Sequence, residues 1–272
     1  MIVEPSRPVL RIFSYLPNPR VWKSLITARL CDVTVEVVGD EPANLANWLW
    51  DFDARLLTAS ERREESPFAR VSRRGFSGTL FKTDDFLRAH PFGTVPAAFS
   101  DDGQTGIFES NSILRAVARR GADRRQLYGR DDDEASRIDG FLDANLVFAR
   151  EAQVFLLGLD ELCEEKHARM AAAYEFYLSG VESALSHGAG HLVGNSLTIA
   201  DISFVCDLAQ FLREGHYGDE FARVGLPLIS VDGPEQYPLS YEHLLNLAAT
   251  KEFAEVMGTY LDWYRKQLGR DE

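Results

Sequence analysis

The chain has 272 residues, which is long for one mixed domain and suits two. Hydrophobic residues make up 45% and charged residues 26%, a composition typical of a folded protein rather than a disordered one. The formal net charge of −13 repels phosphate backbones and anionic lipids, so it argues against nucleic-acid and membrane-surface partners.

The cysteines and the N-terminal residues bear on the cellular compartment. Cys31, Cys163 and Cys206 are widely spaced and form no CxxC pair, so we predict no disulfide framework. The first residues contain no apolar run preceded by basic residues, which predicts no signal peptide. No stretch approaches the roughly 20 apolar residues of a membrane span. We therefore expect a cytoplasmic protein.

The chain opens with a strand–helix–strand pattern. Residues 9–15 predict a strand, which ends at a proline–asparagine–proline breaker at 17–19. Apolar residues then recur at helical spacing over 21–30, and the β-branched run 33–38 predicts a second strand. Two strands and a helix within about 30 residues indicate a parallel crossover unit.

The segment near 42–82 is less regular. Trp48, Trp50 and Phe52 alternate as in a strand, but leucines between 45 and 57 favour a helix. We predict a helix followed by a mobile loop. Its aromatic residues could line a substrate pocket, cover a partner subunit or simply pack the extra helix, and we favour packing for Trp48 and Phe52.

Two short strands at 95–99 and 106–108 are predicted next, followed by a helix at 110–119 that ends at Gly121. Four acidic residues at 131–134 then favour the start of another helix. Helical periodicity continues to the end of the chain.

Within this helical part, Thr198 and Asp201 form a capping-box pattern, to which we assign a structural role. The domain boundary is expected between residues 121 and 130. The predicted domains are 1–122, with an insert near 42–82, and 130–272.

Four segments, in this order, resemble the glutathione transferase superfamily. They are FSYLPNPRVWKSLI (13–26), FLRAHPFGTVPA (86–97), FESNSIL (108–114) and LVGNSLTIADI (192–202). Within the superfamily, the first and fourth look most like the transferase-like domain of the gamma subunit of elongation factor 1B. The resemblance implies an α/β thioredoxin-like N-terminal domain that binds glutathione, followed by an all-α C-terminal domain. The match departs after the second strand, where this chain is longer by about 25 residues.

The superfamily activates the thiol of glutathione. Lowering a thiol pKa from about 8.5 by two units needs about 2.7 kcal/mol, and one hydrogen bond to the charged form supplies about 1.5–3 kcal/mol. Because the family usually places its thiolate-contacting residue in the first strand-to-helix turn, the resemblance makes Ser14 and Asn18 the predicted catalytic donors. Tyr15 ranks behind them as a glutathione-contacting residue. The alternative is that Asn18 only forms a turn and Ser14 only ends a strand.

The resemblance also implies the residues that hold glutathione. Val95–Pro96 resembles the family's cis-proline bond, whose preceding residue pairs its backbone with the cysteinyl part of the ligand, and Thr94 lies in the same loop. Glu109 is expected to meet the ligand's ammonium group, and Ser110, at a helix start, its carboxylate. The alternative for this pair is an ordinary helix cap.

We predict no metal site. His187 and His191 have i, i+4 spacing, but Gly188 and Gly190 lie between them and make a helix there doubtful. The only cofactor expected is glutathione, as a co-substrate.

The leading hypothesis for function is a glutathione-dependent transferase or lyase whose thiolate attacks a hydrophobic electrophile, expected to be aromatic. Cleavage of β-aryl ethers is one specific form of it. The alternatives are a non-catalytic interaction or scaffold subunit, and the supporting subunit of a heterodimeric enzyme. The expected partners are a hydrophobic small molecule and a second subunit, in a homodimer or a heterodimer.

Overall fold

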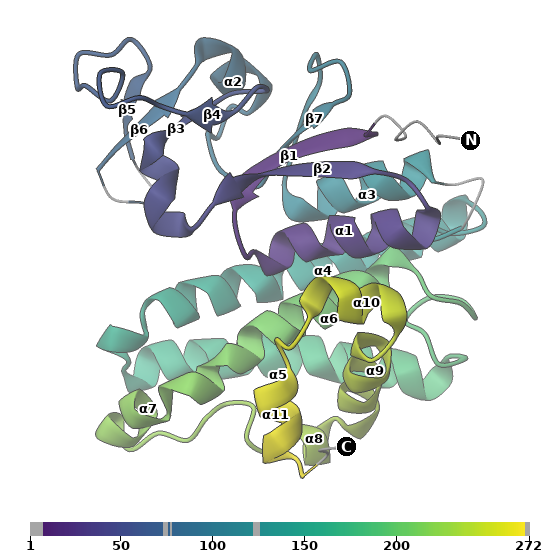
Figure 1. The fold of residues 1–272 in the computed structure, drawn as a ribbon. Coiled ribbons are helices and arrows are strands. Elements are labelled where there is room, and N and C mark those ends of the chain that lie inside the picture. The colour runs from purple at the N-terminus through teal and green to yellow at the C-terminus, as the bar shows by residue number, and fades with distance from the viewer. Residues whose placement is uncertain (1–7, 73–75, 77, 122–125, 270–272) are drawn as a thin grey trace. The chain divides into compact units, whose positions relative to one another are not determined.

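The computed structural model describes residues 8–72, 76, 78–121 and 126–269. The chain divides into two compact units, residues 1–124 and 125–272. The first is α/β and the second is helical, which confirms the predicted fold class (Figure 1).

A four-stranded mixed sheet is the centre of the N-terminal unit. Its strands, in spatial order, are β2 (Val35–Asp40), β1 (Leu10–Tyr15), β7 (Ala97–Ser100) and β8 (Gly106–Phe108). The pairing of β1 with β2 is parallel, as the crossover pattern predicts, and the pairings of β1 with β7 and of β7 with β8 are antiparallel. Helices α1 (Pro19–Cys31) and α3 (Ser110–Arg120) pack side by side against this sheet (Figure 1). Gly121 caps the end of α3, as expected.

The insert is a second sheet, so the prediction of a helix and a mobile loop is wrong. A short 3-10 helix (Pro42–Asn47) leads into it. Its strands, in spatial order, are β4 (Arg55–Leu56), β3 (Trp48–Trp50), β6 (Thr79–Lys82) and β5 (Ala69–Val71). Strands β5 and β6 come from the part that was expected to be a loop.

Burial on both faces explains why the insert resembles a helix in sequence. Leu49 packs with Leu57 and Phe81 on one face, whereas the fully buried Trp50 packs with Phe13 on the other. A strand covered on both faces has apolar residues at consecutive positions, so the period of two is lost.

Helix α2 (Asp84–Ala89) follows the insert and leads to the loop before β7. The hydroxyl oxygen of Thr83 accepts a hydrogen bond from the Phe86 amide and caps the helix start at 3.0 Å. At the other end, the His90 carbonyl accepts a bond from the Gly93 amide, which turns the chain toward Pro96.

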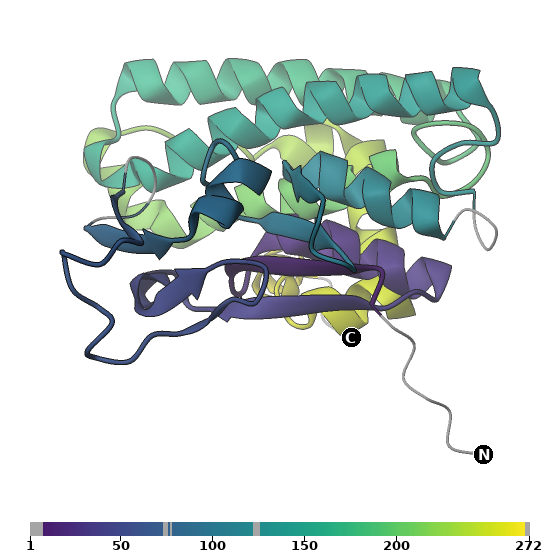
Figure 2. The same cartoon turned by 90° about the horizontal axis from the view of Figure 1, so that it is seen from above.

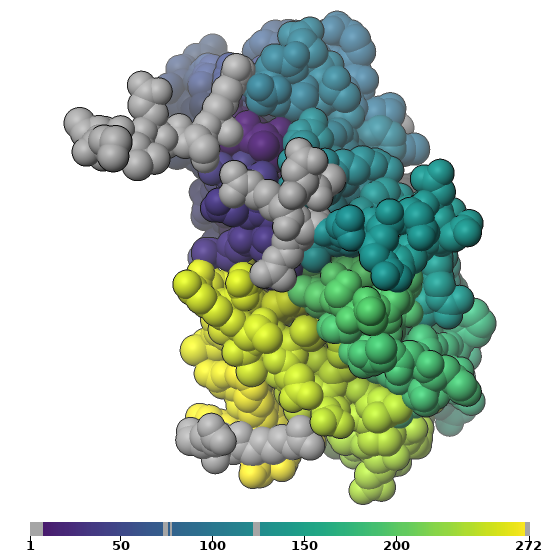
Figure 3. Space-filling model, turned by 90° about the vertical axis from the view of Figure 1, so that its right-hand side faces the viewer, coloured from purple at the N-terminus to yellow at the C-terminus, as the bar shows by residue number. Residues whose placement is uncertain are grey.

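The C-terminal unit is helical throughout its described residues. Its α-helices are α4 (Asp132–Leu157), α5 (Glu164–His187), α6 (Ile199–Phe211), α7 (Gly218–Val224), α8 (Gly233–Gln236), α9 (Pro238–Ala248), α10 (Lys251–Met257) and α11 (Asp262–Gln267). The two longest, α4 and α5, pack side by side (Figure 2). The last helices, in yellow, form one continuous part of this unit's surface (Figure 3).

Local signals decide where the helices of this unit begin. The Asp131 side chain accepts the Glu134 amide at 2.9 Å, so the predicted acidic start of α4 is confirmed. The capping box of Thr198 and Asp201 at the start of α6 is likewise confirmed. Helix α6 is buried along almost its whole length and is the core of the unit.

Candidate functional site

The turn between β1 and α1 holds the two predicted catalytic donors in a buried pair. The Asn18 side-chain amide donates to the Ser14 hydroxyl oxygen at 3.0 Å, and its own oxygen accepts the Arg20 amide at 2.9 Å. Asn18 is therefore the N-cap of α1. Ser14 is 0% exposed and Asn18 is 1% exposed. Both side chains are engaged in holding the turn.

Tyr15 points to the opposite face of the sheet from Ser14. Side chains alternate along a strand, and Leu10 and Ile12 pack in the cluster that contains Val21 of α1. Phe13 and Tyr15 instead contact the aromatic cluster on the other face. Tyr15 is half-buried, whereas Ser14 and Asn18 are buried, so Tyr15 is the most exposed of the three first-turn residues.

The loop before β7 contains the predicted proline bond, and that bond is cis. The Leu16–Pro17 bond is also cis, which was not predicted. In the loop, Thr94 is exposed, Val95 is half-buried against the same aromatic cluster as Tyr15, and Pro96 is buried.

Strand register brings the predicted glutathione-binding positions to one end of the sheet. Phe13 pairs with Ala97, and Ala97 pairs with Phe108. These pairs bring the end of β1, the loop before β7 and the start of α3 to the same end of the sheet. Neighbouring strands lie about 4.8 Å apart, so these positions span about 10 Å, a distance suited to a tripeptide.

The start of α3 has an unusual backbone. Glu109 has φ 66° and ψ 128°, although it is not glycine, and its side chain is exposed. Such a conformation costs about 1–3 kcal/mol and is most common at functional sites. The Glu109 side chain makes no capping hydrogen bond, and its carbonyl accepts the amides of Ser112 and Ile113. The helix start is thus held in place without a side-chain cap.

Lys82 is a site residue that the sequence analysis did not predict. Its ammonium group donates to the Gly93 carbonyl at 2.6 Å, just before the cis-proline bond, and lies 4.4 Å from the centre of the Trp50 ring. Burial, together with the nearby charge of Arg70, lowers the pKa of Lys82 to about 8. No carboxylate in the described ranges forms an ion pair with it. A lysine that ends an otherwise apolar strand was the signal available in the sequence.

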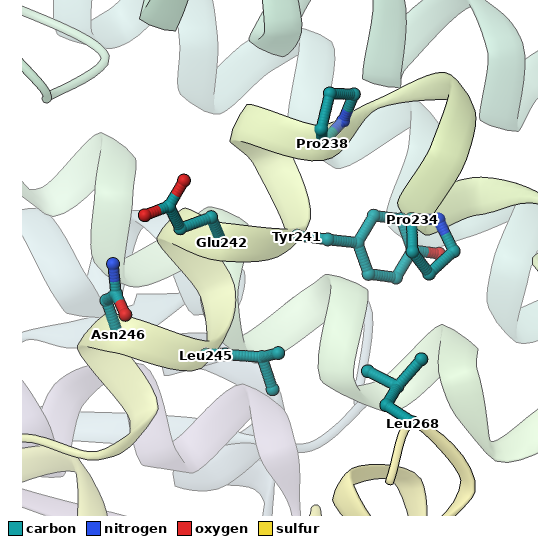
Figure 4. A pocket seen from close by; sticks show the side chains of 7 residues that line it. All are labelled: Pro234, Pro238, Tyr241, Glu242, Leu245, Asn246 and Leu268. Atoms are coloured by element: carbon teal, nitrogen blue, oxygen red, sulfur yellow. The ribbon is translucent and has the colours of Figure 1, made fainter. Parts of the chain in front are cut away.

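Other features fall outside this group of residues. The hollow in Figure 4 lies between α8, α9 and Leu268, with Tyr241 and Leu245 among its lining residues, and contains none of the predicted site residues. None of the three cysteines, all of which the structure describes, forms a disulfide; Cys31 and Cys206 are buried and Cys163 is exposed. Within the described residues, no helix combines the length and apolar character needed to cross a bilayer.

Comparison with known proteins shows which chains this one resembles. No protein-family model matches the chain. A glutathione S-transferase-like protein, FUS3 of Gibberella moniliformis, is 25% identical over 91% of each chain. Elongation factor 1-gamma 2 of Oryza sativa is 32% identical, but over 48% of this chain and 31% of its own length.

Comparison of folds, like comparison of sequences, finds glutathione transferases. The glutathione transferase URE2P8 from Phanerochaete chrysosporium, solved with oxidized glutathione, matches 99% of this chain and 100% of its own with a TM-score of 0.63 at 17% identity. Ure2p in complex with glutathione matches 93% of this chain with a TM-score of 0.57. In sequence and in fold, the chain is similar to members of the glutathione transferase superfamily. Its sequence is also related to elongation factor 1-gamma, as the motifs predicted.

Proposed function

We propose that this chain is a glutathione-dependent transferase or lyase, in which the bound thiolate attacks a hydrophobic electrophile. The observation that carries the proposal is the strand register, which brings the end of β1, the start of β7 and the end of β8 to one end of the sheet, where Tyr15, Val95 and Ser110 lie at or near the strand ends. Glutathione has an ammonium and a carboxylate at one end, a thiol in the middle and a second carboxylate at the other. The residues at this end of the sheet have the chemistry to match each part.

In this proposal, the γ-glutamyl end of glutathione lies at the start of α3. Its carboxylate accepts hydrogen bonds from the Ser110 hydroxyl and the first amides of the helix, where the helix dipole favours negative charge. Its ammonium pairs with the exposed carboxylate of Glu109. The ligand thereby supplies the cap that the chain itself does not provide.

The middle of the ligand lies along the loop before β7. The backbone of Val95 pairs with the cysteinyl residue as an added strand would. Thr94 and Pro96 lie on either side of Val95 and contact the same part of the ligand. Lys82, beside this loop, is the cation for the remaining carboxylate. A buried ammonium whose partners in the described ranges are a carbonyl and a ring gains from an anionic partner.

We assign thiolate stabilisation to Tyr15 first. Ser14 and Asn18 stay in the proposal as positioning residues, because their polar atoms hold each other and the start of α1. A phenol that donates to the thiolate contributes about 1.5–3 kcal/mol, which lowers the thiol pKa by one to two units.

The aromatic residues of the insert add little to the choice of electrophile. Trp50 and Phe81 are buried within the insert, and Trp48 contacts Phe13 at a ring-centroid distance of 5.9 Å. Their first role is to hold the second sheet together. Attack on an aromatic electrophile, including β-aryl ether cleavage, therefore rests on the chemistry of the superfamily, as do a dimeric state and a cytoplasmic location.

The second candidate is a glutathione-binding or scaffold protein without catalytic activity, alone or as the supporting subunit of a heterodimer. The higher identity to the elongation factor chains favours it. The two functions differ in whether the bound thiol ionises.

Retention on immobilised glutathione, followed by ultraviolet titration of the bound thiol, separates these functions. If the chain is an enzyme, it should be retained on immobilised glutathione, and the bound thiol should show a thiolate absorption band at neutral pH. Tyr15→Phe should then raise the pKa of the bound thiol by one to two units. Tyr217→Phe, in the other unit, is the matched control. Retention without the band supports the scaffold function, and an unshifted transition in Tyr15→Phe removes Tyr15 from the mechanism.

A further inference from the structure

A second group of chemically capable side chains lies in the C-terminal unit. His191 precedes α6, Asp201 lies in the first turn of α6, and His243 lies on α9. Each offers one ligand atom, and the three atoms lie within 4.8 Å of one another. His243 Nε2 is 2.9 Å and His191 Nδ1 is 3.8 Å from the same oxygen, Asp201 Oδ1.

The two oxygens of Asp201 have separate partners. Oδ2 accepts the amide of Thr198 at 2.8 Å and its hydroxyl at 2.9 Å, which completes the capping box. Oδ1 accepts the Leu192 amide at 2.9 Å and faces both histidines. A carboxylate oxygen accommodates two partners, so an ion bound to Oδ1 leaves the capping box and the Leu192 bond intact.

Hydrogen bonding alone does not explain the buried position of the Nδ1 atom of His191. Its Nδ1 atom is buried and makes no hydrogen bond to any residue that the structure describes. The 3.8 Å to Asp201 Oδ1 is too long for a hydrogen bond. His243 is held in place by stacking on Phe204, with ring centroids 6.0 Å apart. A buried nitrogen thus points at a carboxylate oxygen without bonding to it.

We propose that His191, Asp201 and His243 bind a divalent transition-metal ion, of which Zn²⁺ fits best. Tetrahedral Zn²⁺, with bonds of about 2.0–2.2 Å, places neighbouring ligand atoms about 3.4 Å apart. The distances from Asp201 Oδ1 to the two histidines, 2.9 and 3.8 Å, lie on either side of that value, and all three ligand atoms lie within 4.8 Å of one another, so binding the ion requires a small shift of the histidine rings. Two imidazoles and one carboxylate form a set that zinc and other first-row ions accept.

The surroundings allow a fourth ligand from solvent. A hollow of about 350 Å³ is lined by His191 together with Arg137, Phe141, His187 and Leu192. In the proposed site, a water from this hollow is the fourth ligand. The site also joins α9 to the start of α6, so metal binding should stabilise the C-terminal unit.

The test uses the full-length chain after treatment with a chelator. Titration with Zn²⁺ against a chromogenic chelator should show one ion per chain, and the melting temperature should rise. Co²⁺ at the same site should give the visible absorption of tetrahedral coordination. His191→Gln should weaken Zn²⁺ affinity by at least about tenfold, because it removes one of three protein ligands.

His187→Gln is the matched control, because His187 lines the same hollow but lies outside the proposed ligand set. This variant should retain full affinity. Failure to retain one ion per chain would overturn the proposal, and so would equal weakening by both variants or no effect of His191→Gln. In those cases the three side chains form only a structural polar cluster around the cap of α6.

Discussion

Helices α1 and α3 of the N-terminal unit begin in opposite ways. Helix α1 is capped by the buried side chain of Asn18, which accepts the Arg20 amide and donates to Ser14. Helix α3 begins after Glu109, which provides no side-chain cap and holds a positive φ. The N-cap side chain thus satisfies the start of α1, whereas the N-cap side chain of α3 makes no such bond. A helix start that lacks its own cap, and is held there despite backbone strain, is the better candidate for binding an anion.

The largest effect is expected from the charge at the start of α3. Glu109→Gln should weaken binding of S-methylglutathione by about 30-fold, since a charge-assisted bond to the ligand's ammonium is worth about 2 kcal/mol. The unfolding free energy should not change, because the side chain is exposed. Calorimetric titration measures the affinity, with the exposed Glu64→Gln as control. Equal affinities in the two variants would mean that Glu109 is only an ordinary helix start.

The start of α1 should respond in the opposite manner. Asn18→Ala should lower the unfolding free energy by about 1–2 kcal/mol, because it removes a cap and leaves Ser14 with one partner fewer. Urea denaturation measures this loss, and Asn195→Ala, at an exposed position, is the control. Glutathione affinity should be retained. Lost thiolate formation with unchanged stability would instead restore Asn18 as the catalytic donor.

Lys82 is the proposed cation for the carboxylate at the other end of glutathione, away from the start of α3. With a pKa of about 8, its ammonium is mostly charged at pH 7 and mostly neutral at pH 9. The affinity for S-methylglutathione should therefore fall by up to about tenfold between these pH values, in proportion to the charged fraction of Lys82. The Lys82→Met variant should bind S-methylglutathione weakly at both pH 7 and pH 9. Its affinity should lose the pH dependence that comes from the titration of Lys82. If the affinity of the wild type and of the variant falls equally with pH, a group other than Lys82 causes the pH dependence.

The smallest effect concerns the backbone of Glu109. Glycine adopts positive φ without the cost that other residues incur, so Glu109→Gly should raise the unfolding free energy by about 1 kcal/mol. It should also weaken glutathione binding, because the carboxylate is lost. Comparison with Glu109→Gln separates the two contributions. A less stable Glu109→Gly variant would show that this conformation carries no strain.

Patterns carried by neighbouring residues predicted much of the fold. The first crossover unit, the acidic start of α4 and the capping box at Thr198 all depend on side chains within a few residues of the backbone that they organise. The resemblance to the superfamily added the cis bond at Pro96. The insert was mispredicted because strand β3 is buried on both faces, and its parallel partner β6 lies about 30 residues further along the chain.

The sequence alone determined the fold class, the resemblance to the superfamily and the segments that carry it, since these follow from local periodicity, caps and order along the chain. Only the tertiary structure decided that Ser14 and Asn18 are buried, that Lys82 lies beside the loop before Pro96 and that His243 meets Asp201. Which side chains are accessible, and which distant ones meet, depends on strand register and on the packing of elements far apart in sequence. No local pattern encodes either.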